Sequence, residues 1–125
     1  MTGPPSLQPG SRVRQQDWEG RDLSGTRQES VELVEVDVTD VVATGARWVD
    51  STFRDCRFTG ASFTRTALTG CTSIGCDLAG VTFTDCTLVG SRFGRCRYDR
   101  LTVQGGDWSF AGLRGADLRR TRFTG

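Results

Sequence analysis

Large apolar residues recur at every fifth position along most of this chain. Counting in fives from Gln16 to Gly125 divides 110 residues into 22 repeats without an insertion. The third position of each repeat is apolar except at Gln28 and Ser73. A period of five matches neither the 3.6 of a helix nor the 2 of a strand. The pattern therefore predicts a repeat architecture in which the chain turns every five residues.

The fifth position of each repeat carries the residue type expected at such a turn. Glycine occupies half of the 22 fifth positions, namely 20, 25, 45, 60, 70, 75, 80, 90, 105, 115 and 125. Glycine tolerates the φ values that tight turns demand. Short extended segments joined by turns can hydrogen-bond to the next layer of the same repeat, roughly 4.8 Å away.

The sequence resembles the pentapeptide-repeat family, whose loose consensus is A-(D/N)-L-x-x. Ala116–Arg120, read as ADLRR, and Cys76–Gly80, read as CDLAG, are close matches. The resemblance implies an all-β fold, a right-handed quadrilateral β-helix in which four repeats form one coil of twenty residues. It also implies that the third-position side chains fill the interior. We expect about five coils over residues 16–125.

Residues 1–15 hold all three prolines of the chain, and we expect them to form an N-terminal tail or cap. Two third positions inside the repeat region are polar. Gln28 would need hydrogen-bond partners if its amide pointed inward. At the other, either Ser73 is tolerated beside a large neighbour such as Phe53 or Phe93, or a local bulge turns Ile74 inward. We expect the bulge.

The five cysteines all occupy the first position of a repeat, where alanine and valine also occur. A twenty-residue coil would stack three of them in one column. In-register neighbours lie about 4.8 Å apart with parallel Cβ vectors, whereas a disulfide prefers converging Cβ atoms about 3.8 Å apart. We therefore expect reduced core thiols and a cytoplasmic location, the alternative being a labile disulfide or a metal site. The core cysteines are Cys56, Cys71, Cys76, Cys86 and Cys96.

Charge is distributed unevenly although the net charge is only +1. Residues 1–50 hold nine acids and five arginines (5 − 9 = −4), and residues 51–125 hold six acids and eleven arginines (11 − 6 = +5). One second-position column alternates in sign near its centre, which predicts ion pairs of Asp37 with Arg57 and of Asp77 with Arg97. Arginines also cluster near the C-terminus, where they could form an anion-binding or interaction surface. These are Arg95, Arg97, Arg100, Arg119, Arg120 and Arg122.

The composition argues against catalysis. The chain has no histidine, which removes the commonest general base and the Ser-His and Cys-His nucleophile pairs. The glycines are explained by turns, and no phosphate-binding loop accompanies them. A short threonine column at Thr44, Thr64 and Thr84 is explained by the preference of threonine for exposed β-structure. We expect no cofactor and no metal.

The last coil has no polar cap, and an uncapped solenoid end tends to associate. Either the natural chain continues beyond Gly125 or the C-terminal ends pair in a two-fold homodimer. We expect pairing through Leu113, Leu118 and Phe123. No apolar run is long enough for a signal peptide or a membrane span, so we expect no membrane partner.

These features favour a non-catalytic protein-interaction scaffold whose partner is unknown. The resemblance to the pentapeptide-repeat family adds one alternative, because its quinolone-resistance members imitate duplex DNA and bind DNA gyrase, a type II topoisomerase. Only the N-terminal half of this chain has the acidic character that such mimicry requires. The second alternative is anion or nucleic-acid binding through the C-terminal arginines. We expect that nucleic acid is not the partner.

Overall fold

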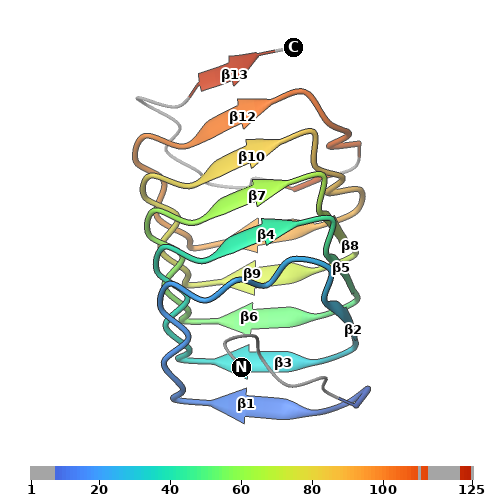
Figure 1. Cartoon of the computed structure of the whole chain (residues 1–125), viewed down its shortest axis with the longest axis vertical. Coiled ribbons are helices and arrows are strands. Elements are labelled where there is room, and N and C mark those ends of the chain that lie inside the picture. The colour runs from blue at the N-terminus through green and yellow to red at the C-terminus, as the bar shows by residue number, and fades with distance from the viewer. Residues whose placement is uncertain (1–7, 110, 113–121, 125) are drawn as a thin grey trace.

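The computed structural model is a stack of square coils built only of short strands and turns (Figure 1). It describes residues 8–109, 111–112 and 122–124. Each three-residue strand pairs in parallel with strands twenty residues away, as in the register Arg12↔Glu32 and Phe63↔Phe83. The expected quadrilateral β-helix, with four five-residue repeats in each coil, is therefore confirmed.

Three sides of the coil are parallel sheets, seen in Figure 1 as the rear, front and right-hand ladders of arrows. The first is the β1 sheet, made of β1 (Arg12–Arg14), β3 (Glu32–Val34), β6 (Thr52–Arg54), β9 (Thr72–Ile74) and β11 (Arg92–Gly94). The second is the β4 sheet, made of β4 (Val42–Thr44), β7 (Ser62–Thr64), β10 (Thr82–Thr84), β12 (Thr102–Gln104) and β13 (Arg122–Thr124). The third is the β2 sheet, made of β2 (Arg27–Glu29), β5 (Arg47–Val49) and β8 (Ala67–Thr69).

The fourth side has no strand within residues 16–20, 36–40, 56–60, 76–80 and 96–100, all of which the structure describes. Its coils are joined by single bridges, including Asp37↔Arg57 and Asp77↔Arg97. In three of these five coils a second-position aspartate explains the change of local structure, because a short carboxylate can accept a hydrogen bond from the backbone two residues on and form a turn. Oδ1 of Asp37 accepts from the amide of Thr39 at 3.0 Å, and Oδ1 of Asp77 accepts from that of Ala79 at 3.0 Å.

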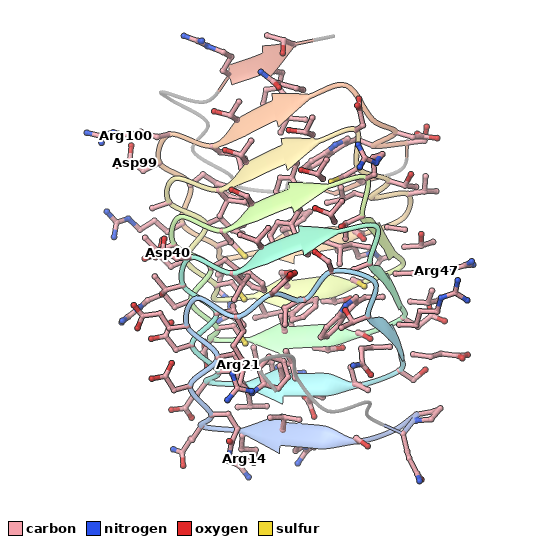
Figure 2. The ribbon with its side chains drawn as sticks, viewed as in Figure 1. Arg14, Arg21, Asp40, Arg47, Asp99 and Arg100 are labelled. Atoms are coloured by element: carbon pink, nitrogen blue, oxygen red, sulfur yellow. The ribbon has the colours of Figure 1, made fainter. Side chains whose placement is uncertain are left out.

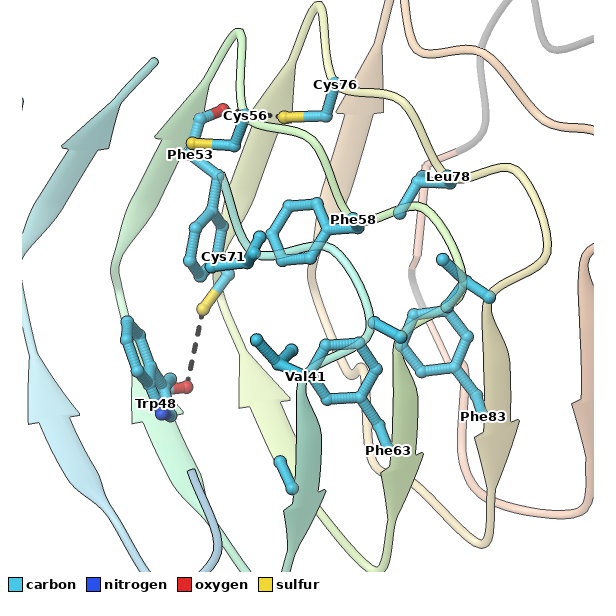
Figure 3. Packing of buried hydrophobic residues seen from close by; sticks show 14 of the residues in the cluster. Val41, Trp48, Phe53, Cys56, Phe58, Phe63, Cys71, Cys76, Leu78 and Phe83 are labelled. Atoms are coloured by element: carbon cyan, nitrogen blue, oxygen red, sulfur yellow. Dashed lines mark hydrogen bonds between the residues drawn. The ribbon is translucent and has the colours of Figure 1, made fainter. Parts of the chain in front are cut away.

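Third-position side chains point to a shared axis and form one continuous core. Phe63 and Phe83, one coil apart, stack with ring centroids 5.3 Å apart, and Phe58 lies 6.1 Å from Phe63 (Figure 3). Leu78 is buried in the same cluster. One interior void, lined by residues such as Leu23, Leu33 and Val38, measures about 20 Å³. That is room for about one water molecule, so a substrate has no space at this point of the core.

The backbone turns sharply at nearly every fifth position, as the glycine pattern predicted. Non-glycine residues also adopt positive φ at these corners, among them Glu35 (54°), Asp40 (58°), Arg95 (50°) and Arg100 (59°). A corner in this solenoid therefore accepts acidic and basic side chains as well as glycine. Each such residue costs on the order of 1 kcal/mol of backbone strain, which the hydrogen bonds between coils offset.

Part of the expected N-terminal tail or cap pairs with the first coil, because β1 lies at Arg12–Arg14 and pairs with β3. One expectation needs correction. The predicted bulge at Ile74 is wrong: Ser73 is buried, with only 6% of its surface exposed, and stands in register between Phe53 and Phe93. Hydrogen bonds on both sides hold that register, and a bulge would break them.

Gln28 does take the inward position, and only 4% of its surface is exposed. Among the described residues, no helix is long and apolar enough to cross a membrane.

Candidate functional site

Charged side chains gather on the strand-free side of the coil and on its two flanking corners. We call this surface, made of residues 15–20, 35–40, 55–60, 75–80 and 95–100, the charged face. Figure 2 shows Asp40, Asp99 and Arg100 along this edge and Arg47 along the opposite edge of the solenoid. The charged face holds eight acids and four arginines: Asp17, Glu19, Glu35, Asp37, Asp40, Asp55, Asp77, Asp99, Arg57, Arg95, Arg97 and Arg100.

The acidic side chains of this face lie mostly in the first coils. The carboxylate oxygens of Asp17, Glu19 and Asp37 lie within 4.8 Å of one another. Oxygen ligands in such a group are of the type that hard divalent cations bind. Asp17 and Glu19 are exposed, however, and Oδ1 of Asp17 already accepts a hydrogen bond from the amide of Glu19 at 2.9 Å. Sequence reasoning missed this cluster, although the twenty-residue spacing of Asp17 and Asp37 places them in adjacent coils.

An open hollow of about 580 Å³ lies next to this cluster. Its lining includes the carboxylates of Glu35, Asp37 and Asp55 and the guanidinium of Arg57. Asp37 has a lowered pKa, chiefly because the Thr39 hydroxyl lies beside its carboxylate and the Thr39 amide donates to it, with a smaller contribution from the charge of Arg57. The hollow therefore keeps its negative charge at neutral pH and suits a cationic group.

One of the two predicted ion pairs is present on this face. Nη1 of Arg97 lies 3.7 Å from Oδ2 of Asp77, and the Arg97 side chain is 70% exposed. Asp37 and Arg57 are bridge partners in adjacent coils and attract each other electrostatically. Exposed pairs of this kind contribute on the order of 0–1 kcal/mol each, so they help to fix the register more than the stability.

The structure brings only part of the predicted arginine group together. Arg95, Arg97 and Arg100 lie in one coil of the charged face, on a corner, on the side and on the next corner. Arg122 is exposed on β13, in the β4 sheet, and therefore on a different side. Arg119 and Arg120 lie outside the described residues.

The residues predicted to form a dimer contact can be placed only in part. Phe123 is described and is 48% exposed at the last strand, where its ring centroid lies 6.3 Å from that of Trp108. Leu113 and Leu118 lie outside the described residues.

The five thiols are free and lie at the first positions of their repeats; Cys96 is partly exposed and the other four are buried. Each described thiol sits against backbone carbonyls of its own and the preceding coil. Sγ of Cys71 lies 3.3 Å from the carbonyl oxygen of Trp48, and Sγ of Cys76 lies 3.3 Å from that of Phe53 (Figure 3). Thr66 uses the same position to donate to the Ala43 carbonyl at 3.1 Å. A thiol or hydroxyl at this position can therefore contact the backbone, although alanine and valine also fill it.

Burial raises the pKa of Cys71 to about 11, and burial also raises the pKa of Cys86. Thiols shielded from solvent and held in the neutral form are poor nucleophiles and poor metal ligands. The arrangement therefore supports a packing role for Cys71 and Cys86.

A search of curated proteins found no match. Similar solved structures include the pentapeptide repeat protein Rfr23 from the cyanobacterium Cyanothece 51142, with 13% identity, a TM-score of 0.38 and coverage of 92% of this chain and 86% of that one. A pentapeptide repeat protein from the Arabidopsis thaliana thylakoid lumen has 20% identity, a TM-score of 0.41 and coverage of 88% and 63%. QnrB1, a plasmid-mediated fluoroquinolone resistance protein, has 13% identity, a TM-score of 0.31 and coverage of 90% and 82%.

Identities and TM-scores this low do not transfer a partner or an activity. The family is shown by the sequence itself, because a profile described as the pentapeptide repeat region matches residues 46–123, more than half of the chain. Together with the uninterrupted five-residue register and the square coils, this match shows that the chain belongs to the pentapeptide repeat family.

Proposed function

We propose that the protein is a non-catalytic scaffold that binds another protein through its charged face. The concentration of twelve charged side chains on this one face and its corners carries the proposal. The fold holds them on a backbone that is hydrogen-bonded from coil to coil, for example from the Asp37 amide to the Gln16 carbonyl at 2.9 Å. A rigid array of charges favours selective and fast association with a complementary surface.

The β4 sheet offers less for recognition. Outward positions in the middle of the β4 sheet are uncharged and include Ser62, Thr64, Thr82, Thr84 and Thr102. The absence of histidine and the packed core support a role without catalysis. Five cysteines that form no disulfide are typical of a reducing compartment, so we also propose a cytoplasmic location.

The test compares two triple variants that each remove three negative charges. E35Q/D37N/D40N changes the charged face, and D22N/E29Q/D107N changes exposed positions elsewhere. Asparagine and glutamine keep a side-chain oxygen that can accept the turn hydrogen bonds. In capture from the source cells, a specific partner should be retained by wild type and by the second variant and lost by the first. Equal retention by both variants would contradict the assignment of the face.

Mimicry of DNA toward DNA gyrase is the second candidate. The grouped carboxylates of Asp17, Glu19 and Asp37 favour it, since a DNA mimic needs rows of negative charge. Arg95, Arg97 and Arg100 at the other end of the same face weaken it. A gyrase supercoiling assay with and without a quinolone separates the two candidates. Inhibition or protection that disappears in E35Q/D37N/D40N would support mimicry, and no effect of the wild-type protein would exclude it.

Two further interactions remain predictions. Anion binding by the arginines would appear as salt-dependent retention on heparin that falls when Arg95, Arg97 and Arg100 are changed to glutamine. End-to-end pairing is favoured by the exposed ring of Phe123 on β13. Light scattering of Phe123→Asp tests it, because this substitution should convert an end-to-end dimer to a single chain.

A further inference from the structure

The charges of the charged face are arranged so that the face is complementary to itself in reverse. Three columns run along it, parallel to the solenoid axis. The corner column reads Glu35, Asp55, Gly75, Arg95. The central column reads Asp37, Arg57, Asp77, Arg97, and the second corner column reads Asp40, Gly60, Gly80, Arg100. In each column the first and last residues have opposite charge.

We propose that two copies of this chain associate side by side and antiparallel through their charged faces. The two-fold axis lies in the interface, perpendicular to the solenoid axis, between the coils of Arg57 and Asp77. This rotation places each column of one copy opposite the same column of the other copy, running in the reverse direction, as an isologous interface requires.

This one operation places opposite charges together at both ends of the contact. The coil of Asp37 in one copy faces the coil of Arg97 in the other. Within one copy these two coils are three coil spacings, or about 14 Å, apart along the solenoid axis. The pairs are Glu35 with Arg95, Asp37 with Arg97, and Asp40 with Arg100. The two central coils add Arg57 with Asp77. Each pair occurs twice by symmetry, and no like charges oppose one another within these four coils.

Other arrangements of the same faces place like charges together. A parallel two-fold arrangement lays the two corner columns on each other, so that Glu35 faces Asp40 and Arg95 faces Arg100. An antiparallel arrangement whose axis passes through Arg57 shifts the second copy by one coil and places Asp37 opposite Asp77. Opposition of like charges costs several kcal/mol across an interface, so the charge pattern selects one register.

The shape of the face agrees with this register. Small residues surround the axis, because Thr59, Gly60, Ala79 and Gly80 lie between the charged ends. The two faces can therefore approach closely at the centre. The open hollow that Glu35, Asp37 and Asp55 line lies at the acidic end, where the arginines of the second copy arrive. The Arg97 guanidinium, although paired with Asp77, is 70% exposed and keeps donors for a second carboxylate.

The self-association rests on the same charged face as the proposed function, but it can be wrong while the proposed function is right. If the wild-type protein stays a single chain while E35Q/D37N/D40N still loses its partner in the capture experiment, only the self-association is wrong. Phe123→Asp separates this contact from the end-to-end contact, because it leaves the charged face unchanged.

The experiment is sedimentation equilibrium of charge-reversed variants over a range of protein and salt concentrations. Because the contact consists of exposed ion pairs, the wild-type association constant should fall about tenfold or more between about 0.02 M and about 0.5 M salt. The acidic variant R95E/R97E/R100E and the basic variant E35R/D37R/D40R should each be single chains at low salt. The corners tolerate these changes, since Glu35 and Arg95 share nearly the same φ (54° and 50°), as do Asp40 and Arg100 (58° and 59°).

Two combinations of these charge reversals make the test specific. A one-to-one mixture of the acidic and basic variants should form a heterodimer, because every pair is again opposite in charge. The sextuple variant that carries both sets of changes should regain a homodimer with the same salt dependence. R27E/R47E/R92E, with the same change of net charge on other faces, should associate like wild type. A wild-type protein that remains a single chain at low salt, or triple variants that associate as wild type does, would overturn the proposal.

Discussion

The carboxylate of Asp50 occupies the space that a side chain on Gly70 would need, one coil further along the solenoid. Its Oδ1 lies 2.5 Å from the point where a Cβ on Gly70 would stand. Asp85 stands in the same relationship to Gly105, also at 2.5 Å. Corner aspartates and the glycines that follow them by twenty residues are therefore matched pairs.

Gly70→Ala should destabilise the protein more than Gly90→Ala. Both glycines have positive φ, 65° and 72°, so each substitution carries a backbone cost of about 1–2 kcal/mol. At Gly70 the new methyl group must also displace the Asp50 carboxylate, whereas a Cβ on Gly90 meets nothing within 4 Å. Urea unfolding should show about 1 kcal/mol of additional loss at Gly70. In an Asp50→Gly background the two alanine variants should become equal, and a difference that persists there would contradict the pairing.

Ile74 and Phe83 test which side chains of the repeat form the core. Phe83 is buried and stacked on Phe63, so Phe83→Ala should cost about 3–5 kcal/mol. Ile74 is half-buried at a fourth position where threonine is common, so Ile74→Thr should cost less than about 1 kcal/mol. Denaturant unfolding measures both. A loss at Ile74 as large as that at Phe83 would restore the bulge that the sequence analysis predicted.

The five-residue period was sufficient to predict the coil, the core column and the interior thiols, because one frame fixes which side chains point inward. The same pattern did not predict that Ser73 keeps its inward position. Whether the chain bulges at one polar core position depends on hydrogen bonds with both neighbouring coils. The amide of Thr72 donates to the Ser51 carbonyl of the preceding coil at 2.9 Å, and the amide of Gly75 donates to the Gly94 carbonyl of the following coil at 2.9 Å. Those bonds hold the regular register.

The early start of the solenoid was visible in principle. Val13 occupies the third position of a repeat that the frame extends backward from Gln16, but the nearby prolines concealed it. The strand-free side also had a signal, since an aspartate at the second position accepts the fourth-position amide in each described case. These cases are Asp17, Asp22, Asp37, Asp77 and Asp107. The sequence did not predict which side chains meet on the charged face, because their placement depends on the backbone conformation at the corners, which only the structure gives.

Alkaline pH should destabilise the fold through its buried thiols. Burial raises the pKa of Cys71 to about 11, whereas an exposed thiol in the unfolded chain ionises near pH 8.5–9. The folded state therefore holds the proton more tightly, and its stabilising effect is fully present below about pH 8.5–9 and lost as the pH rises toward 11. The chain has no lysine and no histidine to mask this change.

Cys71→Ser provides the matched variant, because buried Ser51 and Ser91 occupy equivalent positions and a hydroxyl does not ionise in this range. Urea unfolding at pH 8 and pH 10.5 should show a loss for wild type that exceeds the loss for Cys71→Ser by about 2 kcal/mol. Equal losses would mean that Cys71 is accessible to solvent. Rapid reaction of the buried thiols with a thiol reagent at pH 8, without denaturant, would lead to the same conclusion.

The turn at Asp37 should depend on its side-chain oxygen and, at acidic pH, on its charge. Asp37→Ala removes the acceptor for the Thr39 amide and should cost about 1 kcal/mol at pH 7. Asp37→Asn keeps an acceptor oxygen and should cost less. The hydrogen bonds from Thr39 lower the pKa of the Asp37 carboxyl, so their stabilising effect is present above about pH 4 and is lost as the pH falls through the folded-state pKa. Thermal unfolding between pH 3 and pH 7 should therefore show a smaller acid-induced loss for both variants than for wild type. If Asp37→Asn and Asp37→Ala lose equal stability at pH 7, the carboxylate acts through its charge on Arg57 and the turn does not depend on the hydrogen bond.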